Sequence, residues 1–490
     1  MNVHSQERIQ HWLAERTRRH FFRDCGVGLG TIAFNSLLGQ LQARHLPAID
    51  PARPMGARIP PLPARAKNVI FLHMAGAPSQ LELFEDKPKL RELHGKTPPK
   101  SLMEGKRFAF IKGTPKMLGP MFKYQQHGQS GMWFSENIPH IGGIADEMTM
   151  FRTCKTNLFN HAPAKLFMNT GTGIFGRPSM GSWVTYGLGS ENQNLPGFIV
   201  MCPGGYPIQE SQNWQSGFLP GIYQGTHIDT RHTAVEKLIE HIKNRGLSLA
   251  EQRRQLDFIQ TLNRRHAARR QKDAQLEARI QSFELAYRMQ MDATDAFDVN
   301  REPKHIRELY GEGTQARQLL IARRLVERGV RFVQVWHGSG QPWDNHDDIE
   351  VNHRRLAGQC DQGIGALLKD LKQRGLLDET LVLWGGEFGR TPTVELPTPG
   401  SNAGKINGRD HNHHGFTMWR AGGGAKGGSV YGATDEFGYF ATKDRVHVHD
   451  FNATILHLLG LDHERLTYRH AGRDFRLTDV YGHVVKELLT

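Results

Sequence analysis

Cysteine is scarce in this chain. Its 490 residues contain only Cys25, Cys154, Cys202 and Cys360, and no two of these form a Cys-x-x-Cys pair. Four cysteines are too few for a disulfide framework at this length, although a single disulfide stays open. Because no cysteine lies near the polar clusters described below, a metal site there must use other side chains, which argues against a structural zinc knuckle.

Long apolar runs are also few. The apolar stretch near the N-terminus, Cys25–Leu38, has 14 residues, whereas a membrane-spanning helix needs about 20. It follows Thr17–Arg23, whose Arg-Arg-His-Phe-Phe pattern resembles a twin-arginine export signal for folded proteins. We predict an export signal at 1–45, a linker at 46–64 and a periplasmic or extracellular protein without a stable membrane span. A helical N-terminal arm is the alternative.

Acidic residues are in deficit, and the formal net charge is +13. Much of the excess lies in the predicted signal and in residues 245–272, which carry eight basic and two acidic side chains. A surface that follows nucleic-acid phosphates would interleave aromatic side chains with the basic ones, and residues 245–272 contain only Phe258. We interpret this segment as a solvated helix face and expect no nucleic-acid partner.

Apolar runs alternate with amphipathic segments along the rest of the chain. Continuous apolar runs typical of buried parallel strands occur at 68–74, 148–152, 195–201, 330–336, 380–384 and 416–419. Helical patterns occur at 160–171, 315–328, 356–374 and 450–460, the last with Asp450 as the predicted N-cap. The spacing at 231–298 predicts an inserted antiparallel helical pair. This alternation predicts one α/β domain over 65–490 with a mostly parallel central sheet.

Three polar clusters follow predicted strands, where ligands gather in open α/β sheets. They are His337 with Trp343–His346, Glu387–Arg390 in the strand tip after 380–384, and Asp410–His411 with His413 and His414. Carboxylates and neutral histidines are ligands of zinc, manganese, magnesium or calcium ions. We predict that the clusters share one metal or anion site, although any single histidine could instead be a packing or surface residue.

Eight segments of the chain share a pattern with one known family. They are Val69–Pro88, His161–Gly171, Asn213–Gln224, Ala322–Val330, Trp343–His346, Gly386–Pro392, Gly408–His411 and Val430–Asp435. In these segments the chain resembles the family called domain of unknown function 1501, a twin-arginine-exported, sulfatase-like family in the alkaline phosphatase superfamily. The resemblance covers most of residues 65–485 and implies an alkaline phosphatase/sulfatase-like α/β/α sandwich.

The resemblance also implies which residues form the site, and it shows departures from the superfamily pattern. Ala75-Gly76 stand where superfamily enzymes have an aspartate after the first strand. His161 stands where sulfatases have their modified nucleophile, with Lys165 in place of an arginine. Glu387-Phe388 keep the acid of an Asp-His pair and lose its histidine.

The residues that remain are enough to hold one divalent metal ion. The implied ligands are Asp344, His346, Glu387 and His411, with Asp410 orienting His411 from outside the first ligand sphere. Arg390 and Lys165 are then expected to bind a substrate anion. His161, expected at a helix N-terminus, would be a nucleophile or general base.

These assignments lead to two hypotheses for the function. The first is an exported metal-dependent hydrolase of sulfate or phosphate esters, either small molecules or glycans, that lacks the usual nucleophile. The second is a non-catalytic binding protein of the same fold that recognises sulfated or phosphorylated glycans or a protein partner. The retained acid and histidine clusters favour the first, and the missing aspartate and histidine favour the second.

Overall fold

A computed structural model of the chain describes residues 49–50, 53–103, 111, 114–238, 246–269, 280, 284–285, 287–289, 293–394 and 407–489. The predicted export signal (1–45) lies outside the described residues, as do parts of the predicted linker (46–64) and of the predicted insertion (231–298). Within the described residues, no helix is both long and apolar enough to cross a membrane.

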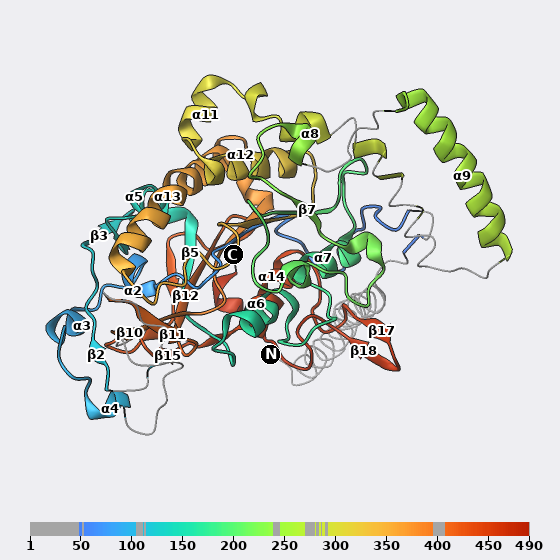
Figure 1. Cartoon of the computed structure of the whole chain (residues 1–490). Coiled ribbons are helices and arrows are strands. Elements are labelled where there is room, and N and C mark those ends of the chain that lie inside the picture. Colours follow the sequence, from blue (N-terminus) through green and yellow to red (C-terminus); the bar gives the residue numbers. More distant parts are fainter. Residues whose placement is uncertain are drawn as a thin grey trace, which may run out of the picture. The chain divides into compact units, whose positions relative to one another are not determined.

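A nine-stranded sheet forms the centre of the described domain (Figure 1). Its strand order is β13-β5-β12-β9-β1-β8-β6-β7, and β16 also pairs with β5. Strand β12 is antiparallel to both of its neighbours, and all other pairs in this sheet are parallel. The predicted α/β fold with a mostly parallel sheet is therefore confirmed. The strands are β1 (Asn68–His73), β5 (Met148–Lys155), β6 (Phe198–Met201), β7 (Thr226–Ile228), β8 (Phe332–Trp336), β9 (Thr380–Gly385), β12 (Phe416–Ala421), β13 (Ser429–Tyr431) and β16 (Val446–His447).

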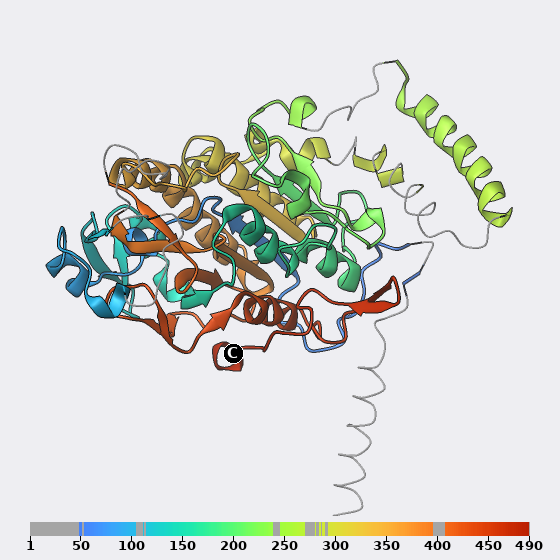
Figure 2. The same cartoon turned by 60° about the horizontal axis from the view of Figure 1, so that its bottom comes forward.

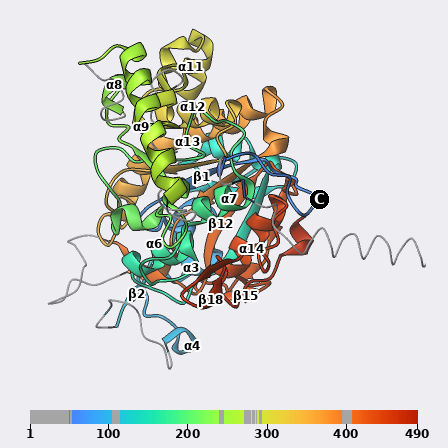
Figure 3. The ribbon, with the colours of Figure 1, turned by 90° about the vertical axis from the view of Figure 1, so that its right-hand side faces the viewer.

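Helices cover both faces of this sheet (Figure 1, Figure 2 and Figure 3). Because strand side chains alternate between the faces, Ile70 and Leu72 of β1 join the large apolar cluster with helices α12 and α13. The side chains of Phe71 and His73 point to the opposite face. One layer contains α11 (Lys304–Tyr310), α12 (Thr314–Glu327) and α13 (Ile349–Gln373), and the other contains α6 (His161–Thr170), α7 (Met180–Leu188) and α14 (Val448–Leu458).

A small second sheet extends from the end of β9 and positions part of the candidate site. It contains β2 (Lys116–Met117), β10 (Gly389–Val394) and β11 (Arg409–Asn412). Strands β10 and β11 are antiparallel, with Arg390 opposite His411. The prediction that Arg390 lies in a strand tip is therefore wrong, because Arg390 is the second residue of a new strand. Only Gly386, Glu387 and Phe388 connect the two strands.

The remaining described elements are short, except for helix α9 (Leu249–Arg269) in the predicted insertion. Arg253 of α9 donates to both carboxylate oxygens of Glu284, at 3.0 and 2.9 Å. The short elements are α2 (Gln80–Leu83), α3 (Pro88–Glu92), α4 (Lys100–Met103), α5 (Pro139–Gly142), α8 (Val235–Leu238), β3 (Tyr124–His127), β4 (Met132–Ser135), β14 (Ala433–Thr434), β15 (Ala441–Lys443), β17 (Tyr468–His470) and β18 (Arg473–Phe475).

The start of α14 differs from its prediction. His447, not Asp450, is the N-cap, and its ring nitrogen accepts a hydrogen bond from the His449 N–H. The Asp450 carboxylate accepts from the His447 N–H at 2.9 Å, which completes a reciprocal capping box. The helix therefore begins two residues before Asp450, at Val448.

Candidate metal centre

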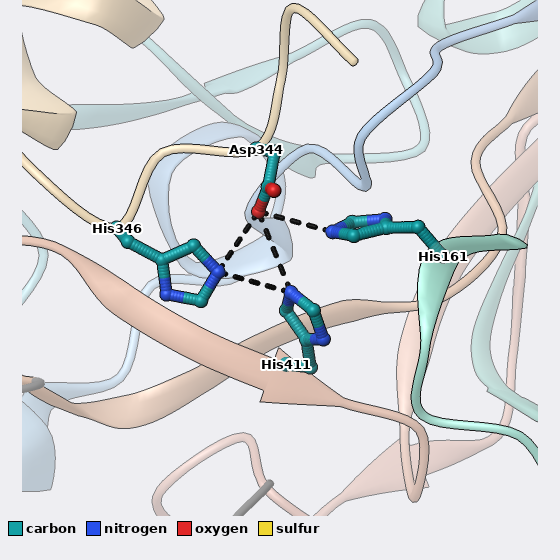
Figure 4. A group of neighbouring side chains, drawn as sticks. All are labelled: His161, Asp344, His346 and His411. Carbon is teal, nitrogen blue, oxygen red and sulfur yellow. Dashed lines mark hydrogen bonds and ion pairs between the residues drawn. The ribbon is translucent and has the colours of Figure 1, made fainter. Parts of the chain in front are cut away.

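Four side chains from three parts of the chain point toward one another at the edge of the sheet (Figure 4). His161 is the first residue of α6, Asp344 and His346 lie in the loop between β8 and α13, and His411 lies on β11. One potential ligand atom from each residue lies within 4.8 Å of the other three. The three histidines are buried, and the Asp344 side chain is 20% exposed. The open side of the group is therefore at Asp344.

The Asp344 carboxylate is the centre of this group. Its Oδ1 atom lies 3.0 Å from His161 Nε2, 2.9 Å from His346 Nε2 and 3.4 Å from His411 Nε2. The Nε2 atoms of His346 and His411 are 3.0 Å apart. Three ring nitrogens and one carboxylate oxygen thus converge on one small volume.

The hydrogen bonds of the Nδ1 atoms determine whether each Nε2 atom faces that volume with a proton or with a lone pair. His411 Nδ1 is 2.7 Å from the Phe159 carbonyl oxygen, and His161 Nδ1 is 2.6 Å from Glu387 Oε1. These oxygens only accept hydrogen bonds, so both Nδ1 atoms carry the proton. In a neutral ring the Nε2 atom then presents a lone pair to the centre.

The charge states follow from burial and neighbouring charges. Burial lowers the pKa of His411 to about 3 despite the nearby Asp344 carboxylate, with Arg390 contributing in the same direction, so the ring is neutral at pH 7. Burial opposes ionisation of Asp344, but the neighbouring Arg390 guanidinium outweighs it and holds the pKa of this carboxyl well below its usual range. The ionised Asp344 oxygen therefore faces the lone pair of the neutral His411 ring. A cation between them removes this repulsion.

Glu387 lies behind His161. Its Oε1 atom also accepts from the Gly76 N–H at 3.0 Å, and its Oε2 atom lies 3.7 Å from His73 Nε2. The side chain is fully buried, which by itself raises its pKa. The charge of Lys165 and the hydrogen bond from His161 Nδ1 reverse this effect and hold the pKa of Glu387 well below the usual range. Glu387 is thus an ionised carboxylate that orients the His161 ring.

Arg390 is surrounded by protein acceptors. Its Nε donates to the Ala77 carbonyl at 2.9 Å, its Nη1 to the Arg409 carbonyl at 3.1 Å, and its Nη2 to the Gly76 carbonyl and to Asp344 Oδ1, the latter at 2.7 Å. The side chain is fully buried. All three guanidinium nitrogens therefore donate to protein acceptors. Arg390 holds Asp344 in place and is not positioned to bind a ligand anion through two parallel hydrogen bonds.

Lys165 is likewise enclosed. Its Nζ donates to Gln341 Oε1 at 3.0 Å and lies 3.8 Å from Glu387 Oε1, and its side chain has no exposed surface. Burial lowers the pKa of this lysine, against the effect of the Glu387 carboxylate. Its position balances the charge of Glu387, whereas an anion-binding role was expected.

Asp410 lies on the same strand as His411 but, as its neighbour, projects to the opposite face. Its Oδ1 accepts from the backbone N–H of His411 at 2.7 Å, and its Oδ2 accepts from the Ile111 N–H. The contact that orients the His411 ring comes from the Phe159 carbonyl, and Asp410 was expected to provide it. No side-chain pattern marks a backbone carbonyl, so this role of Phe159 could not be predicted from the sequence.

Gly76 explains one departure from the superfamily pattern. Its φ angle is +101°, and a Cβ atom there would lie 2.5 Å from the Asp344 backbone nitrogen. An aspartate at this position would therefore push the Asp344 loop away. In its place, the Gly76 N–H holds Glu387 and the Gly76 carbonyl holds Arg390.

The predicted clusters contribute unequally to the group. The first contributes Asp344 and His346, whereas His337 accepts a hydrogen bond from Trp343 Nε1 at 3.0 Å and is not in the group. The third contributes His411, while the rings of His413 and His414 pack on each other.

Comparison with solved structures found similar chains at low identity. A sulfatase from Pseudoalteromonas sp. is 11% identical, with 81% of this chain and 68% of the sulfatase covered and a TM-score of 0.34. A phosphonate monoester hydrolase of Agrobacterium radiobacter is 10% identical, with 81% and 74% covered and a TM-score of 0.35. A lipoteichoic acid synthase from Listeria monocytogenes is 11% identical, with 88% and 79% covered and a TM-score of 0.31.

No curated protein gives a significant match to the chain. A family model described as "Protein of unknown function (DUF1501)" matches residues 66–489. The chain therefore belongs to the DUF1501 family, as the sequence resemblance predicted.

Proposed function

We propose that the protein binds one divalent metal ion through His161, Asp344, His346 and His411 and hydrolyses sulfate or phosphate esters. The observation that carries the metal assignment is the convergence of imidazole lone pairs on an ionised carboxylate oxygen. Buried groups of this kind are stable together only when a cation or a shared proton lies between them. The protons of His161 and His411 are already placed on their outer nitrogens.

The donor set narrows the choice of metal. Imidazole nitrogens suit zinc and other late transition ions, whereas magnesium and calcium prefer oxygen ligands. Three nitrogens and one oxygen therefore favour zinc or a related transition ion over magnesium or calcium. A bound ion of this class acts as a Lewis acid that polarises an ester oxygen.

The proposal changes the expected roles of two residues. His161 was expected to be a nucleophile and Glu387 a ligand. Because His161 Nδ1 contacts Glu387 and its Nε2 faces the centre, we assign His161 as a ligand and Glu387 as the carboxylate that orients it. Arg390 and Lys165 hold Asp344 and Glu387 ionised, and Asp410 stays outside the ligand set.

The ester substrate is supported by the sequence resemblance to sulfatase-like proteins. Three of the four residues that this resemblance matched to superfamily ligands, Asp344, His346 and His411, lie in one group, and the fourth, Glu387, contacts His161 from outside it. The four side chains supply no hydroxyl or thiol, so we assign the attack to a water molecule. That water and the ester reach the group from its exposed side, at Asp344.

A non-catalytic binding protein is the second candidate. Four protein ligands fill a tetrahedral zinc site, which is typical of structural sites, whereas catalytic zinc sites keep a position open. The convergence of four ligand atoms favours this candidate. Such a protein would use the centre and its surroundings to recognise a sulfated or phosphorylated glycan or a protein.

One set of measurements separates the candidates. Metal content of the full chain is determined by elemental analysis, and turnover is measured with 4-nitrophenyl sulfate, 4-nitrophenyl phosphate and bis(4-nitrophenyl) phosphate. We expect about one ion per chain in the wild type and loss of both ion and turnover in Asp344→Asn and His346→Ala. His457→Gln, in α14 outside the group, is the matched control. A stoichiometric ion without turnover supports the binding protein, and metal-free protein contradicts both forms of the proposal.

Export is a separate part of the proposal and rests on the sequence of Thr17–Arg23. We propose that residues 1–45 direct the folded protein through the twin-arginine pathway. Replacement of Arg18-Arg19 by Lys-Lys should retain the protein in the cytoplasm of the bacterium, as measured by cell fractionation. Unchanged export of the variant would contradict the twin-arginine assignment.

A further inference from the structure

A polar cavity of about 310 Å³ is lined in part by His413 and His414, which follow His411 of the candidate metal centre along the chain. Lys155, the last residue of β5, and Arg445, between β15 and β16, supply its permanent charges. His413 and His414, which follow β11, supply imidazole groups. Thr156 and Asn157 add polar groups to the lining, and no carboxylate is among the lining residues. We call this cavity the basic cleft.

The cationic groups of the basic cleft have no acidic partner within the described residues. Neither Lys155 nor Arg445 forms an ion pair with a carboxylate of the described residues. Arg445 uses its Nε atom on the Ala441 carbonyl at 2.8 Å. Two adjacent positive charges without a counter-ion attract an anion, and an arginine and a lysine together suit sulfate, phosphate or carboxylate groups.

Backbone hydrogen bonds fix the walls of the basic cleft. The Thr156 N–H donates to the His413 carbonyl at 3.0 Å, and the Ala441 N–H donates to the His414 carbonyl at 3.1 Å. The Asn412 side chain accepts from the His414 N–H at 3.0 Å and donates to the Gly415 carbonyl at 2.9 Å. The segments that carry the lysine, the arginine and the histidines are thus tied together before any ligand binds.

Phe159 connects the basic cleft to the metal centre. Its carbonyl oxygen accepts from His411 Nδ1, and its ring lies 6.1 Å from the His413 ring, measured between centroids. His413 is two residues beyond His411, which corresponds to roughly 7 Å of extended chain. The basic cleft and the metal centre are therefore neighbours along this segment of the chain.

We infer that the basic cleft binds a second anionic group of the molecule whose ester lies at the metal centre. The substrate class is then an ester that carries another sulfate, phosphate or carboxylate close to the reacting one. This inference rests on the proposed function, because it needs the metal centre as the first binding place. The basic cleft would then select esters with two or more anionic groups over esters with one.

The test compares propyl phosphate with propane-1,3-diol bisphosphate, which differ by one phosphate group. Binding to the full metal-loaded chain is measured by calorimetry at fixed salt concentration. We expect the bisphosphate to bind tenfold or more tightly than propyl phosphate, because the second contact forms within one complex. Lys155→Met and Arg445→Met should each remove most of this advantage and leave the affinity for propyl phosphate unchanged.

Lys443→Met is the matched control, since Lys443 lies on β15 near Arg445 but is 75% exposed and does not line the basic cleft. Equal bisphosphate affinity in the wild type and the Lys155 and Arg445 variants would overturn the inference, as would an equal loss in the Lys443 variant. Loss of metal and propyl phosphate binding in His346→Ala supports the proposed function separately. A wild-type protein without metal would refute the proposed function, whatever the basic cleft binds.

Discussion

Among the described residues, two buried polar clusters show two ways of neutralising buried charge. One lies between α12 and α13, where Arg323 donates to Asp370 at 2.9 Å and to Glu327 at 2.7 Å and lies 2.6 Å from Glu302. Arg374 approaches the other oxygen of Asp370 at 2.7 Å. The other cluster is the candidate metal centre, where one carboxylate oxygen faces three imidazole nitrogens.

The two clusters differ in the groups that lie next to their carboxylates. In the α12–α13 cluster each carboxylate meets at least one guanidinium group. In the metal centre, Arg390 is the only permanent cation on Asp344 among the described residues, and the imidazoles bring lone pairs. His161 Nε2 and Glu387 Oε2 are buried there without a hydrogen bond in this geometry. Every carboxylate of the first cluster is paired with a guanidinium group, whereas the second is the cluster for which we propose a bound cation.

The largest expected effect is a loss of stability when the α12–α13 cluster is broken. Arg323→Met removes a fully buried guanidinium and leaves part of the charge on Asp370 and Glu302 unpaired. We expect a loss of about 3 kcal/mol in the free energy of unfolding, at the low end of the range for broken buried pairs. The loss stays at this end because Arg324 still pairs with Glu302 and Arg374 still pairs with Asp370. Denaturant unfolding measures the loss, and the metal content should not change.

Arg301→Met is the control for this substitution, since Arg301 pairs with Asp295 but is 56% exposed. Its expected effect is within about 0.5 kcal/mol. Equal stability of the two variants would break the comparison, because the buried network would then contribute no more than a surface pair.

The sequence predicted the sheet better than it predicted the site. Continuous apolar runs such as Asn68–His73 identify buried strands without knowledge of their neighbours, because burial on both faces requires apolar side chains throughout. Strand β10 was missed because its residues, which include Pro392, form a strand only through contacts with distant segments. One such contact is the Gln80 side chain, which bonds both the N–H and the carbonyl of Arg390.

Residue types could be predicted at the candidate site, but their roles depend on side-chain directions. Asp344, His346 and His411 follow buried strands, so their closeness is expected from a parallel sheet. Whether His161 or Glu387 faces the centre depends on how α6 begins relative to the β9–β10 connection. The spacing of residues does not contain that information. In the proposed site, His161 therefore takes the ligand role that was expected of Glu387, and Glu387 takes an orienting role like the one expected of Asp410.

The next largest expected effect is a loss of metal affinity when the carboxylate behind His161 is replaced. Glu387→Gln keeps the shape of the side chain but removes the charge that orients His161. We expect the metal affinity to fall about 10- to 100-fold, as for other carboxylates behind histidine ligands. Competition with a chromogenic chelator measures the dissociation constant.

Glu379→Gln is the matched control, because Glu379 pairs with Lys67 at the surface and is 54% exposed. Its metal affinity should equal that of the wild type. An unchanged affinity in Glu387→Gln would show that His161 is oriented without its carboxylate partner and would remove Glu387 from the metal centre.

The smallest expected effect is the change in the free energy of unfolding with pH. In metal-free protein this change should occur in different pH ranges for the two clusters. The pKa of buried His411 is about 3, below the ordinary 6.5, so the unfolded chain binds this proton first as the pH falls. Stability should therefore decline from pH 6.5 downward, by at most about 1.4 kcal/mol per unit for this group. Burial favours protonation of Glu302, but Arg323 and Arg324 outweigh it and lower its pKa below 4.5, so its contribution is lost only below that pH.

His411→Asn distinguishes these contributions between pH 5 and 6.5, where only the histidines change charge. Urea unfolding with a chelator present should give a shallower decline for His411→Asn than for the wild type, because the variant has no imidazole to protonate on unfolding. Other buried histidines, such as His337 with a pKa of about 4, contribute equally to both proteins and cancel. Identical slopes would mean that His411 is protonated in the folded metal-free protein. The metal centre would then balance its own charge, as the α12–α13 cluster does.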